Sequence, residues 1–147
     1  MKKRKKIVYV GLSADILHEG HINILKTAYK LGEVIVGLLT DQAIANYKKI
    51  PHLLYKQREV VLKNMKFVKK VIPQYTLDYR PNLNIIKPNY VVHGDDWKTG
   101  IQKNTRLQVI KTLKKWNGKL VEPKYTKNIS SSLIKKNILK VGTSPDM

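Results

Sequence analysis

The sequence predicts a single α/β domain, in which a mostly parallel sheet of about five strands carries helices on both faces. Residues 7–10 and 34–39 are continuous apolar runs rich in β-branched side chains, as buried parallel strands are. Between them, Ile22, Leu25 and Ala28 recur at helical spacing. The length of 147 residues suits one domain with a sizeable core.

Strand, helix and strand together form one right-handed βαβ unit, the first half of a Rossmann-like sheet. Gly32 lies where the C-terminus of the helix favours a left-handed residue. Pro73 is expected to stop a later strand. Beyond the first unit, the pattern predicts short strands at 71–73, 90–93 and 120–121 and a short helix or turn at 42–47. It predicts helical segments at 56–67, 82–86, 102–116 and 133–140.

The chemistry is predicted to lie at the turn between the first strand and the first helix. In open α/β sheets, ligands bind beyond the carboxyl ends of strands, beside helix N-termini that favour anions. His18 and His21 lie at this turn, and their spacing puts both imidazoles on one helix face. Gly20 removes a side chain where a phosphate must approach the backbone. Two imidazoles and backbone N–H groups around one phosphate suit nucleotidyl transfer.

From the residues alone, two other interpretations of this histidine pair stay open. The rings could be structural, or they could form half of a metal site. A zinc site would need further His or Cys ligands, and the chain has no cysteine and no HExxH pattern. We therefore prefer phosphate chemistry and predict no protein metal site.

The composition favours a cytoplasmic protein. Without cysteines the chain cannot form a disulfide framework, which fits a reducing compartment. No apolar run approaches the roughly 18 residues of a membrane span, so no membrane partner is expected.

The formal net charge of +19 is high for a chain of this length. Such charge can mark nucleic-acid binding, because Lys and Arg contacts with phosphates dominate that affinity. Only four of the 29 basic residues are Arg, however, and Arg is the preferred bidentate reader of bases and phosphates. The lysines occur in every segment, without a single basic stripe. We prefer a solvated lysine-rich surface, and a basic nucleic-acid-binding module is the non-enzyme alternative.

Residues 12–21, LSADILHEGH, resemble the GTFD-x-x-H-x-G-H signature of the HxGH nucleotidyltransferase superfamily, in particular its cytidylyltransferase branch. The resemblance covers about residues 5–136. It implies transfer of CMP from CTP to a small acceptor with release of pyrophosphate, Mg²⁺ arriving with CTP, and a homodimer. Later motifs recur in the family's order: Lys48-Lys49, Tyr55-Lys56-Gln57-Arg58, Gly94-Asp95-Asp96-Trp97 and Ile129-Ser130-Ser131-Ser132.

The same resemblance implies a set of site residues. The catalytic residues would be His18, His21 and Lys49, with the lysine reaching over the triphosphate. The nucleotide-binding residues would be Ser13, Gly20, Asp95, Ile129, Ser130 and Ser131. The acceptor phosphate would contact Arg58 and Lys66. From the residues alone, Lys49 and Lys66 could be ordinary surface residues. Ser130 and Ser131 could simply cap the last helix.

Two departures from the family pattern bear on the acceptor. Ser13 stands for the usual Thr, and Tyr125 stands where the last motif, RTxGIS, opens with Arg. Lys124 or Lys127 could replace that charge, though not its bidentate geometry. This variant set most resembles the cytidylyltransferases found with phosphoenolpyruvate mutase in phosphonate biosynthesis, which implies 2-aminoethylphosphonate or 2-hydroxyethylphosphonate as acceptor. The alternatives are a phosphate monoester (glycerol 3-phosphate, phosphocholine or phosphoethanolamine) and an adenylyltransferase.

The nucleotidyltransferase domain is expected to span residues 1–140. Residues 141–147 are then a tail, and its sequence GTSPD resembles the start of a mutase domain. The tail would thus be the start of a linker to a further domain.

Overall fold

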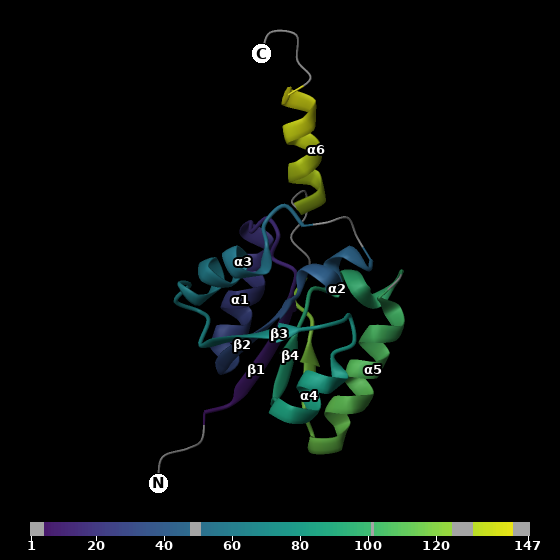
Figure 1. Cartoon of the computed structure of the whole chain (residues 1–147). Coiled ribbons are helices and arrows are strands. Elements are labelled where there is room, and N and C mark those ends of the chain that lie inside the picture. Colours follow the sequence, from purple (N-terminus) through teal and green to yellow (C-terminus); the bar gives the residue numbers. More distant parts are fainter. Residues whose placement is uncertain (1–4, 48–50, 101, 125–130, 143–147) are drawn as a thin grey trace.

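The computed structural model describes residues 5–47, 51–100, 102–124 and 131–142. Strands and helices follow one another along the chain (Figure 1): β1 (Ile7–Leu12), α1 (Glu19–Leu31), β2 (Glu33–Leu39), α2 (Asp41–Ala45), α3 (Tyr55–Lys63), β3 (Lys70–Gln74), α4 (Arg80–Ile86), β4 (Tyr90–Val92), α5 (Lys103–Leu113), β5 (Lys119–Val121) and α6 (Ser131–Gly142). Two 3-10 turns, η1 (Asp95–Lys98) and η2 (Lys114–Trp116), follow β4 and α5.

The five strands form one parallel sheet in the order β3-β2-β1-β4-β5. The chain builds β2 and β3 on one side of β1 and then crosses over to add β4 and β5 on the other side. The strand order therefore reverses between β1 and β4, which is the point where open α/β sheets bind ligands. The predicted Rossmann-like sheet is confirmed. Because every pairing is parallel, all strands start at one edge of the sheet and finish at the opposite edge.

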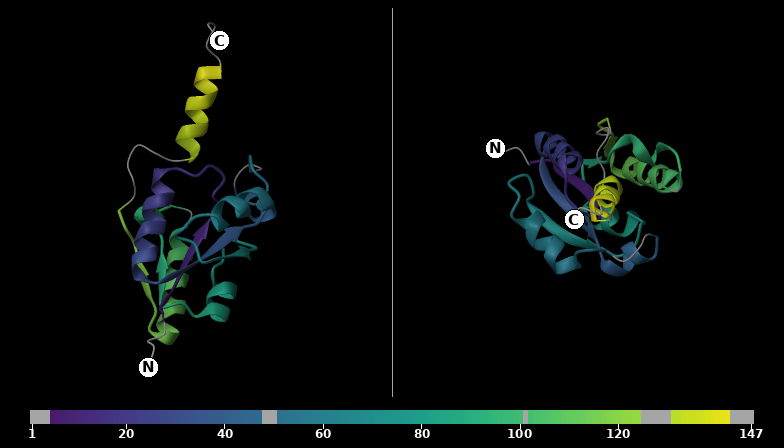
Figure 2. Two further views of the ribbon diagram at one scale, coloured as in Figure 1. Left: turned by 90° about the vertical axis from the view of Figure 1, so that its left-hand side faces the viewer. Right: turned by 90° about the horizontal axis from the view of Figure 1, so that it is seen from above.

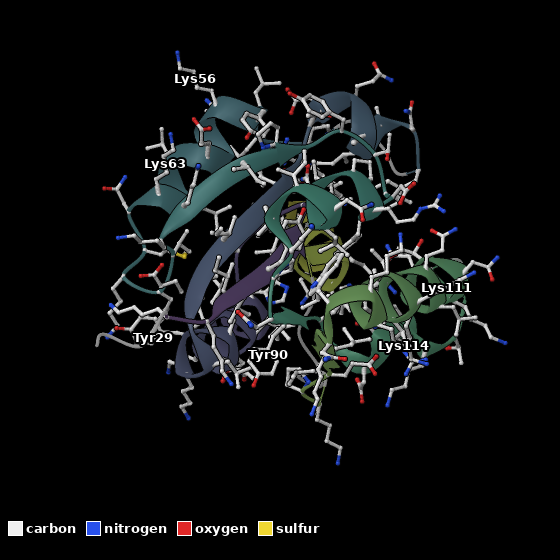
Figure 3. The ribbon with its side chains drawn as sticks, turned by 90° about the horizontal axis from the view of Figure 1, so that it is seen from below. Tyr29, Lys56, Lys63, Tyr90, Lys111 and Lys114 are labelled. Carbon is white, nitrogen blue, oxygen red and sulfur yellow. The ribbon has the colours of Figure 1, made fainter. Side chains whose placement is uncertain are left out.

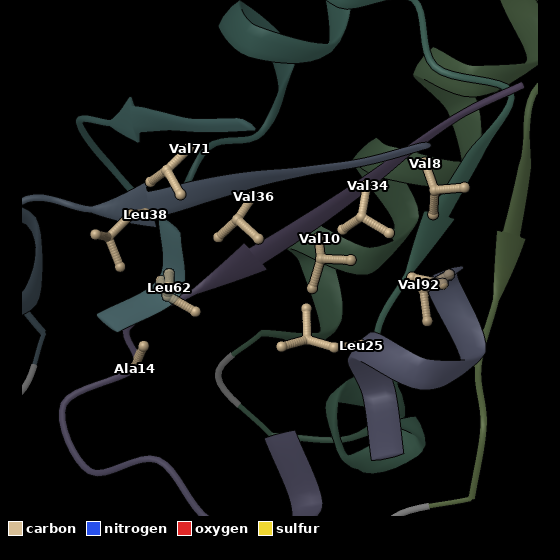
Figure 4. Packing of buried hydrophobic residues seen from close by; sticks show 11 residues of the cluster. Val8, Val10, Ala14, Leu25, Val34, Val36, Leu38, Leu62, Val71 and Val92 are labelled. Atoms are coloured by element: carbon tan, nitrogen blue, oxygen red, sulfur yellow. The ribbon is translucent and has the colours of Figure 1, made fainter. Parts of the chain in front are cut away.

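Alternating side chains of the central strand divide the core into two layers. Val8 and Val10 pack with Leu25 of α1 and Leu62 of α3, and Figure 4 shows this layer. On the other face, Tyr9 packs with residues of α4 and α5. Helices thus cover both faces, as the views in Figure 2 also show.

Several elements end at other residues than predicted; α5, for example, ends at Leu113 rather than at Trp116. Two of these differences have a clear physical reason. β3 continues through Pro73 to Gln74, because β3 is an edge strand and can accommodate a residue without an N–H. α3 ends at Lys63 rather than at Phe67. There the side-chain amide of Asn64 donates to the Val60 carbonyl at 2.8 Å, so a polar side chain competes for the last carbonyls of the helix.

Gly32 ends α1 as predicted, but not in a left-handed conformation. Its φ of 167° is extended backbone. The position needs glycine because a Cβ would collide with the carbonyl oxygen of Lys6. That oxygen accepts a hydrogen bond from the Glu33 N–H at 2.8 Å. The close approach lets β1 and β2 begin side by side.

The last helix, α6, extends away from the end of the sheet at which the strands finish (Figure 1). Over the ranges that the structure describes, no helix combines the length and the apolar character needed to cross a membrane.

Candidate active site

The loop after β1 ends at His18, which is the N-cap of α1. The Gly20 N–H donates to His18 Nδ1 at 3.0 Å, and the His18 N–H donates to His21 Nδ1 at 3.2 Å. This is the reciprocal arrangement of a capping box. The predicted helix start near His18 and the shared face are confirmed, since the two ring centroids lie 4.1 Å apart.

The capping bonds determine which nitrogen of each ring carries the proton. Because both Nδ1 atoms accept from backbone N–H groups, each neutral ring is protonated on Nε2. Burial lowers the pKa of His18 below its usual value, which favours the neutral ring. Each Nε2–H is then a donor suited to a phosphate oxygen. The N-terminus of α1 adds its own N–H groups and the positive end of the helix dipole.

Asp15 joins this loop to the segment that follows residues 48–50. Asp15 is buried, with 5 % of its surface exposed. Oδ1 accepts from the N–H groups of His52 and Leu53 at 2.8 and 3.0 Å, and Oδ2 lies 3.2 Å from His52 Nδ1. The preceding residue, Ala14, has φ +52°, a conformation that costs a non-glycine residue about 1–2 kcal/mol. The structure therefore holds Asp15 in place at some cost in backbone strain.

Arg58 is buried, with 1 % of its surface exposed. Nε donates to the Leu53 carbonyl at 2.9 Å, and Nη1 donates to the Ser13 and Leu39 carbonyls, both at 2.7 Å. Nη2 donates to Asp41 Oδ1 at 2.7 Å. These bonds tie the ends of β1 and β2 to the start of α3.

This environment corrects the expected contact between Arg58 and an acceptor phosphate. The guanidinium donates to protein oxygens and is shielded from solvent, so it is placed to position the loops rather than to meet a ligand. The sequence indicated that Arg58 belongs to this region but not what it contacts.

Lys66 does not lie near the histidines. α3 runs back along the sheet, so the residues after it lie at the edge where the strands begin. There Phe67 packs edge-to-face on Tyr29 in the last turns of α1, with centroids 5.5 Å apart. The Lys66 ammonium lies 5.2 Å from the centroid of the Phe67 ring. The structure does not support the predicted phosphate contact of Lys66.

A second group of polar side chains follows β4. Asp95 is the first residue of η1, at the same edge of the sheet as the histidines. Trp97 is buried, and the His93 ring stacks on it with centroids 3.6 Å apart and planes within 6°. Burial lowers the pKa of His93. The stack fixes the turn that carries Asp95.

Glu122, directly after β5, completes this group. Oε2 accepts from Trp97 Nε1 at 2.8 Å and from Arg106 Nε at 2.9 Å, and Oε1 accepts from Arg106 Nη2 at 2.9 Å. The Arg106 guanidinium lowers the pKa of Glu122. The sequence analysis did not single out Glu122 or Arg106. The available signal was the position of Glu122 at the end of a parallel strand, where site residues gather.

The remaining predicted residues divide into two sets. Ser13 and Gly20 lie in the loop after β1 and in the first turn of α1. The Ser13 side chain hydrogen-bonds Tyr47, whose pKa is raised by burial. Ser131 begins α6. The loop lysine Lys49 and the motif residues Ile129 and Ser130 lie outside the described residues.

Comparison with known proteins places the chain among nucleotidyltransferases. The profile of a family described as "Cytidylyltransferase-like" matches residues 9–137. Glycerol-3-phosphate cytidylyltransferase of Bacillus subtilis is 33 % identical over 97 residues, which cover 64 % of this chain and 74 % of that protein. Ethanolamine-phosphate cytidylyltransferase of Arabidopsis thaliana is 33 % identical over 103 residues, which cover 65 % of this chain and 24 % of that protein.

A solved structure with the same fold is the lipopolysaccharide core biosynthesis protein from Thermoplasma volcanium. It superposes with a TM-score of 0.70 at 26 % identity, and the match covers 84 % of this chain and 100 % of that one.

Proposed function

The chain belongs to the cytidylyltransferase-like family of nucleotidyltransferases, and from this we propose that it transfers CMP from CTP to the phosphoryl group of a small acceptor. The observation that carries this proposal is the pair of capped histidines, His18 and His21, at the N-terminus of α1. Their two Nε2–H donors and the helix N-terminus suit a triphosphate.

In the proposed reaction an acceptor oxyanion attacks the α-phosphorus of CTP in line. A bond forms between the acceptor oxygen and phosphorus, and the bond from phosphorus to the bridging oxygen breaks. Its electron pair leaves with pyrophosphate, so no proton transfer is needed. The Nε2–H groups of His18 and His21 donate to phosphate oxygens whose negative charge rises in the transition state. Lys49 precedes, in the sequence, the segment that Asp15 holds, and it is proposed to contact the triphosphate.

The residues after β4 are proposed to read the cytosine. Asp95 is held in η1 by the stack of His93 on Trp97 and by the bonds of Glu122 to Trp97 and Arg106. A rigid turn is what base discrimination needs, because loosely held groups discriminate poorly.

Mg²⁺ is proposed to enter bound to the triphosphate, where it would neutralise phosphate charge. Within the described ranges, no group of three or more His, Cys, Asp or Glu side chains is arranged to hold a metal ion. The donors available near the phosphates are N–H groups, which complement anions rather than cations.

We expect kcat/KM for CTP to exceed that for ATP by about 100-fold or more, because a base that is read by hydrogen bonds leaves buried groups unpaired when the wrong base binds. Steady-state pyrophosphate release with each nucleotide measures the ratio. The variant Asp95→Asn should lower the ratio of kcat/KM for CTP to that for ATP. The matched control is Asp96→Asn, because Asp96 is the exposed neighbour of Asp95. Equal use of ATP and CTP by the unmodified protein would favour the adenylyltransferase alternative.

For the acceptor we propose a small phosphonate, 2-aminoethylphosphonate or 2-hydroxyethylphosphonate. The support is the departures at Ser13 and Tyr125 and the mutase-like tail. A phosphate monoester is the second candidate, because two relatives are named for glycerol 3-phosphate and ethanolamine phosphate. The two classes differ by a CH₂ group or an oxygen next to phosphorus, so charge alone does not separate them.

We expect higher kcat/KM values for the two phosphonates than for glycerol 3-phosphate, phosphocholine and phosphoethanolamine. Contacts around the bridging atom and its substituent are worth about 1–3 kcal/mol, or roughly 10–200-fold. Initial rates of CMP-product formation over this panel, with CTP saturating, provide the measurement. A phosphate ester as the best acceptor would overturn the phosphonate assignment and leave cytidylyl transfer standing.

A further inference from the structure

The two edges of the sheet differ in their balance of charge, because acidic and basic side chains both lie where the strands end. Acidic residues follow the ends of four strands: Asp15 after β1, Asp41 after β2, Asp95 after β4 and Glu122 after β5. Lysines stand at or shortly before every strand start. We call these exposed residues the lysine surface: Lys6, Lys30, Lys66, Lys70, Lys87 and Lys119.

Strand pairing places Lys70 and Lys119 beside the starts of neighbouring strands. Lys70 pairs with Ile35 near the start of β2, and Lys119 pairs with Tyr90 at the start of β4. The Lys6 ammonium lies 3.4 Å from the Tyr90 hydroxyl. Adjacent strands are about 4.8 Å apart, which is less than the Debye length of about 8 Å at physiological salt. Neighbouring lysines therefore act on a partner as one field. The sequence shows lysines in every segment, and the fold gathers many of them here.

Little acidic charge opposes this field. Glu33 is the one acidic residue of the described ranges that lies at a strand start, and Lys5 approaches it at 3.8 Å. The edge therefore carries a large excess of positive charge.

The kind of side chain indicates the kind of partner. The arginines that the structure describes, Arg58, Arg80 and Arg106, lie near the starts of α3, α4 and α5, at the opposite edge. The lysine surface therefore has no described guanidinium to read a base or clamp a single phosphate in a bidentate way. Lysines alone, as flexible point charges, suit a partner that presents many anionic groups without a fixed pattern.

The arrangement of the surface also favours a broad partner. The lysines come from the strand starts, from the last turn of α1 and from the segment after α3, so they are spread over the whole edge. Figure 3 shows side chains around this end of the domain, including the labelled Lys63 and Lys114. Tyr29, 57 % exposed, and Tyr90 lie among them. Tyrosine rings with a polar end favour the membrane–water interface.

We propose that the lysine surface docks this domain on a membrane whose lipids carry anionic headgroups. The contact is peripheral, and the strand ends with His18 and His21 face away from the lipid. This binding does not depend on the proposed reaction, because the two surfaces lie at opposite edges of the sheet. It departs from the expectation of no membrane partner, which rested only on the absence of an apolar run long enough to span a membrane.

The test uses the full chain and sedimentation with phosphatidylcholine vesicles containing about one third phosphatidylglycerol. We expect binding to these vesicles, little binding to pure phosphatidylcholine, and release as salt is raised. The variant Lys70→Gln/Lys87→Gln/Lys119→Gln should bind about 100-fold more weakly, at roughly fivefold for each lysine. The control Lys56→Gln/Lys98→Gln/Lys103→Gln loses the same charge at the other edge and should bind less than about tenfold more weakly.

The single variant Lys70→Gln, expected to bind about fivefold more weakly, keeps the test decisive if the triple variant unfolds. Pyrophosphate release with soluble substrates should be the same in the lysine-surface variants and the unmodified protein. Equal loss of binding in both triple variants would show that net charge alone acts and would overturn the docking surface. So would equal binding to neutral and anionic vesicles. Tighter binding to single-stranded RNA than to vesicles at equal ionic strength would assign the surface to nucleic acid instead.

Discussion

The variant His18→Asn is expected to lower kcat by roughly 100-fold or more while leaving the fold stable. Asn is a good N-cap, so its side-chain oxygen can accept the Gly20 N–H that His18 Nδ1 now accepts. Its amide N–H groups lie closer to the backbone than Nε2–H of the imidazole, so they do not reach the position from which that donor would stabilise the transition state. Losing one such donor typically costs about 10²–10³ in kcat. Pyrophosphate release gives kcat, and thermal unfolding gives the stability.

A matched variant separates the two roles of this histidine. His18→Ala removes both the donor and the cap, so it should match the Asn variant in kcat but lose about 1 kcal/mol of stability in addition. His21→Ala should likewise reduce kcat. Unchanged kcat in both His18→Asn and His21→Ala would disprove the catalytic assignment of the pair.

The variant Arg58→Met is expected to reduce the free energy of unfolding by about 3 kcal/mol or more. It removes the donor from three backbone carbonyls, and each buried acceptor left unpaired costs about 1–3 kcal/mol. The bond to Asp41 adds less, because that carboxylate is 40 % exposed. Urea unfolding followed by circular dichroism measures the change.

Arg80→Met is the control for this prediction. Arg80 also pairs with a carboxylate, that of Asp78, at 2.9 Å, but its side chain is 50 % exposed. Its loss should leave the free energy of unfolding close to that of the unmodified protein, because solvent screens an exposed ion pair. If Arg58→Met kept full stability and raised KM for the acceptor, the arginine would contact substrate, and its positioning role would be wrong.

The order of strands and helices could be predicted because it depends on local patterns. The apolar run at 34–39 and the helical spacing of Leu25 and Ala28 report burial directly. Element ends were harder to predict, because they depend on single contacts. The side chain of Asn64 bonds the Val60 carbonyl and ends α3 early, and the contact with Lys6 explains Gly32 better than its conformation does.

The site could be predicted where its residues are close together in sequence. His18 and His21 cap each other within one turn, so their spacing carries the geometry. Arg58 could not be interpreted in this way, because its bonds reach Ser13 and Leu39, 45 and 19 positions away. Glu122 was missed for the same reason, since its partners come from η1 and α5.

The edge strand β3 also bears on how copies of this chain can associate. An exposed strand edge is a template for pairing with another strand, and proteins block such edges with proline, charge or short strands. β3 carries Pro73, which has no N–H to donate, and begins with Lys70. β5, the outermost strand on the other side of the sheet, has only three residues. Continuous sheets across two molecules, and the aggregation that follows from them, are therefore disfavoured. The homodimer implied by the family resemblance would have to assemble through side chains on helices and loops.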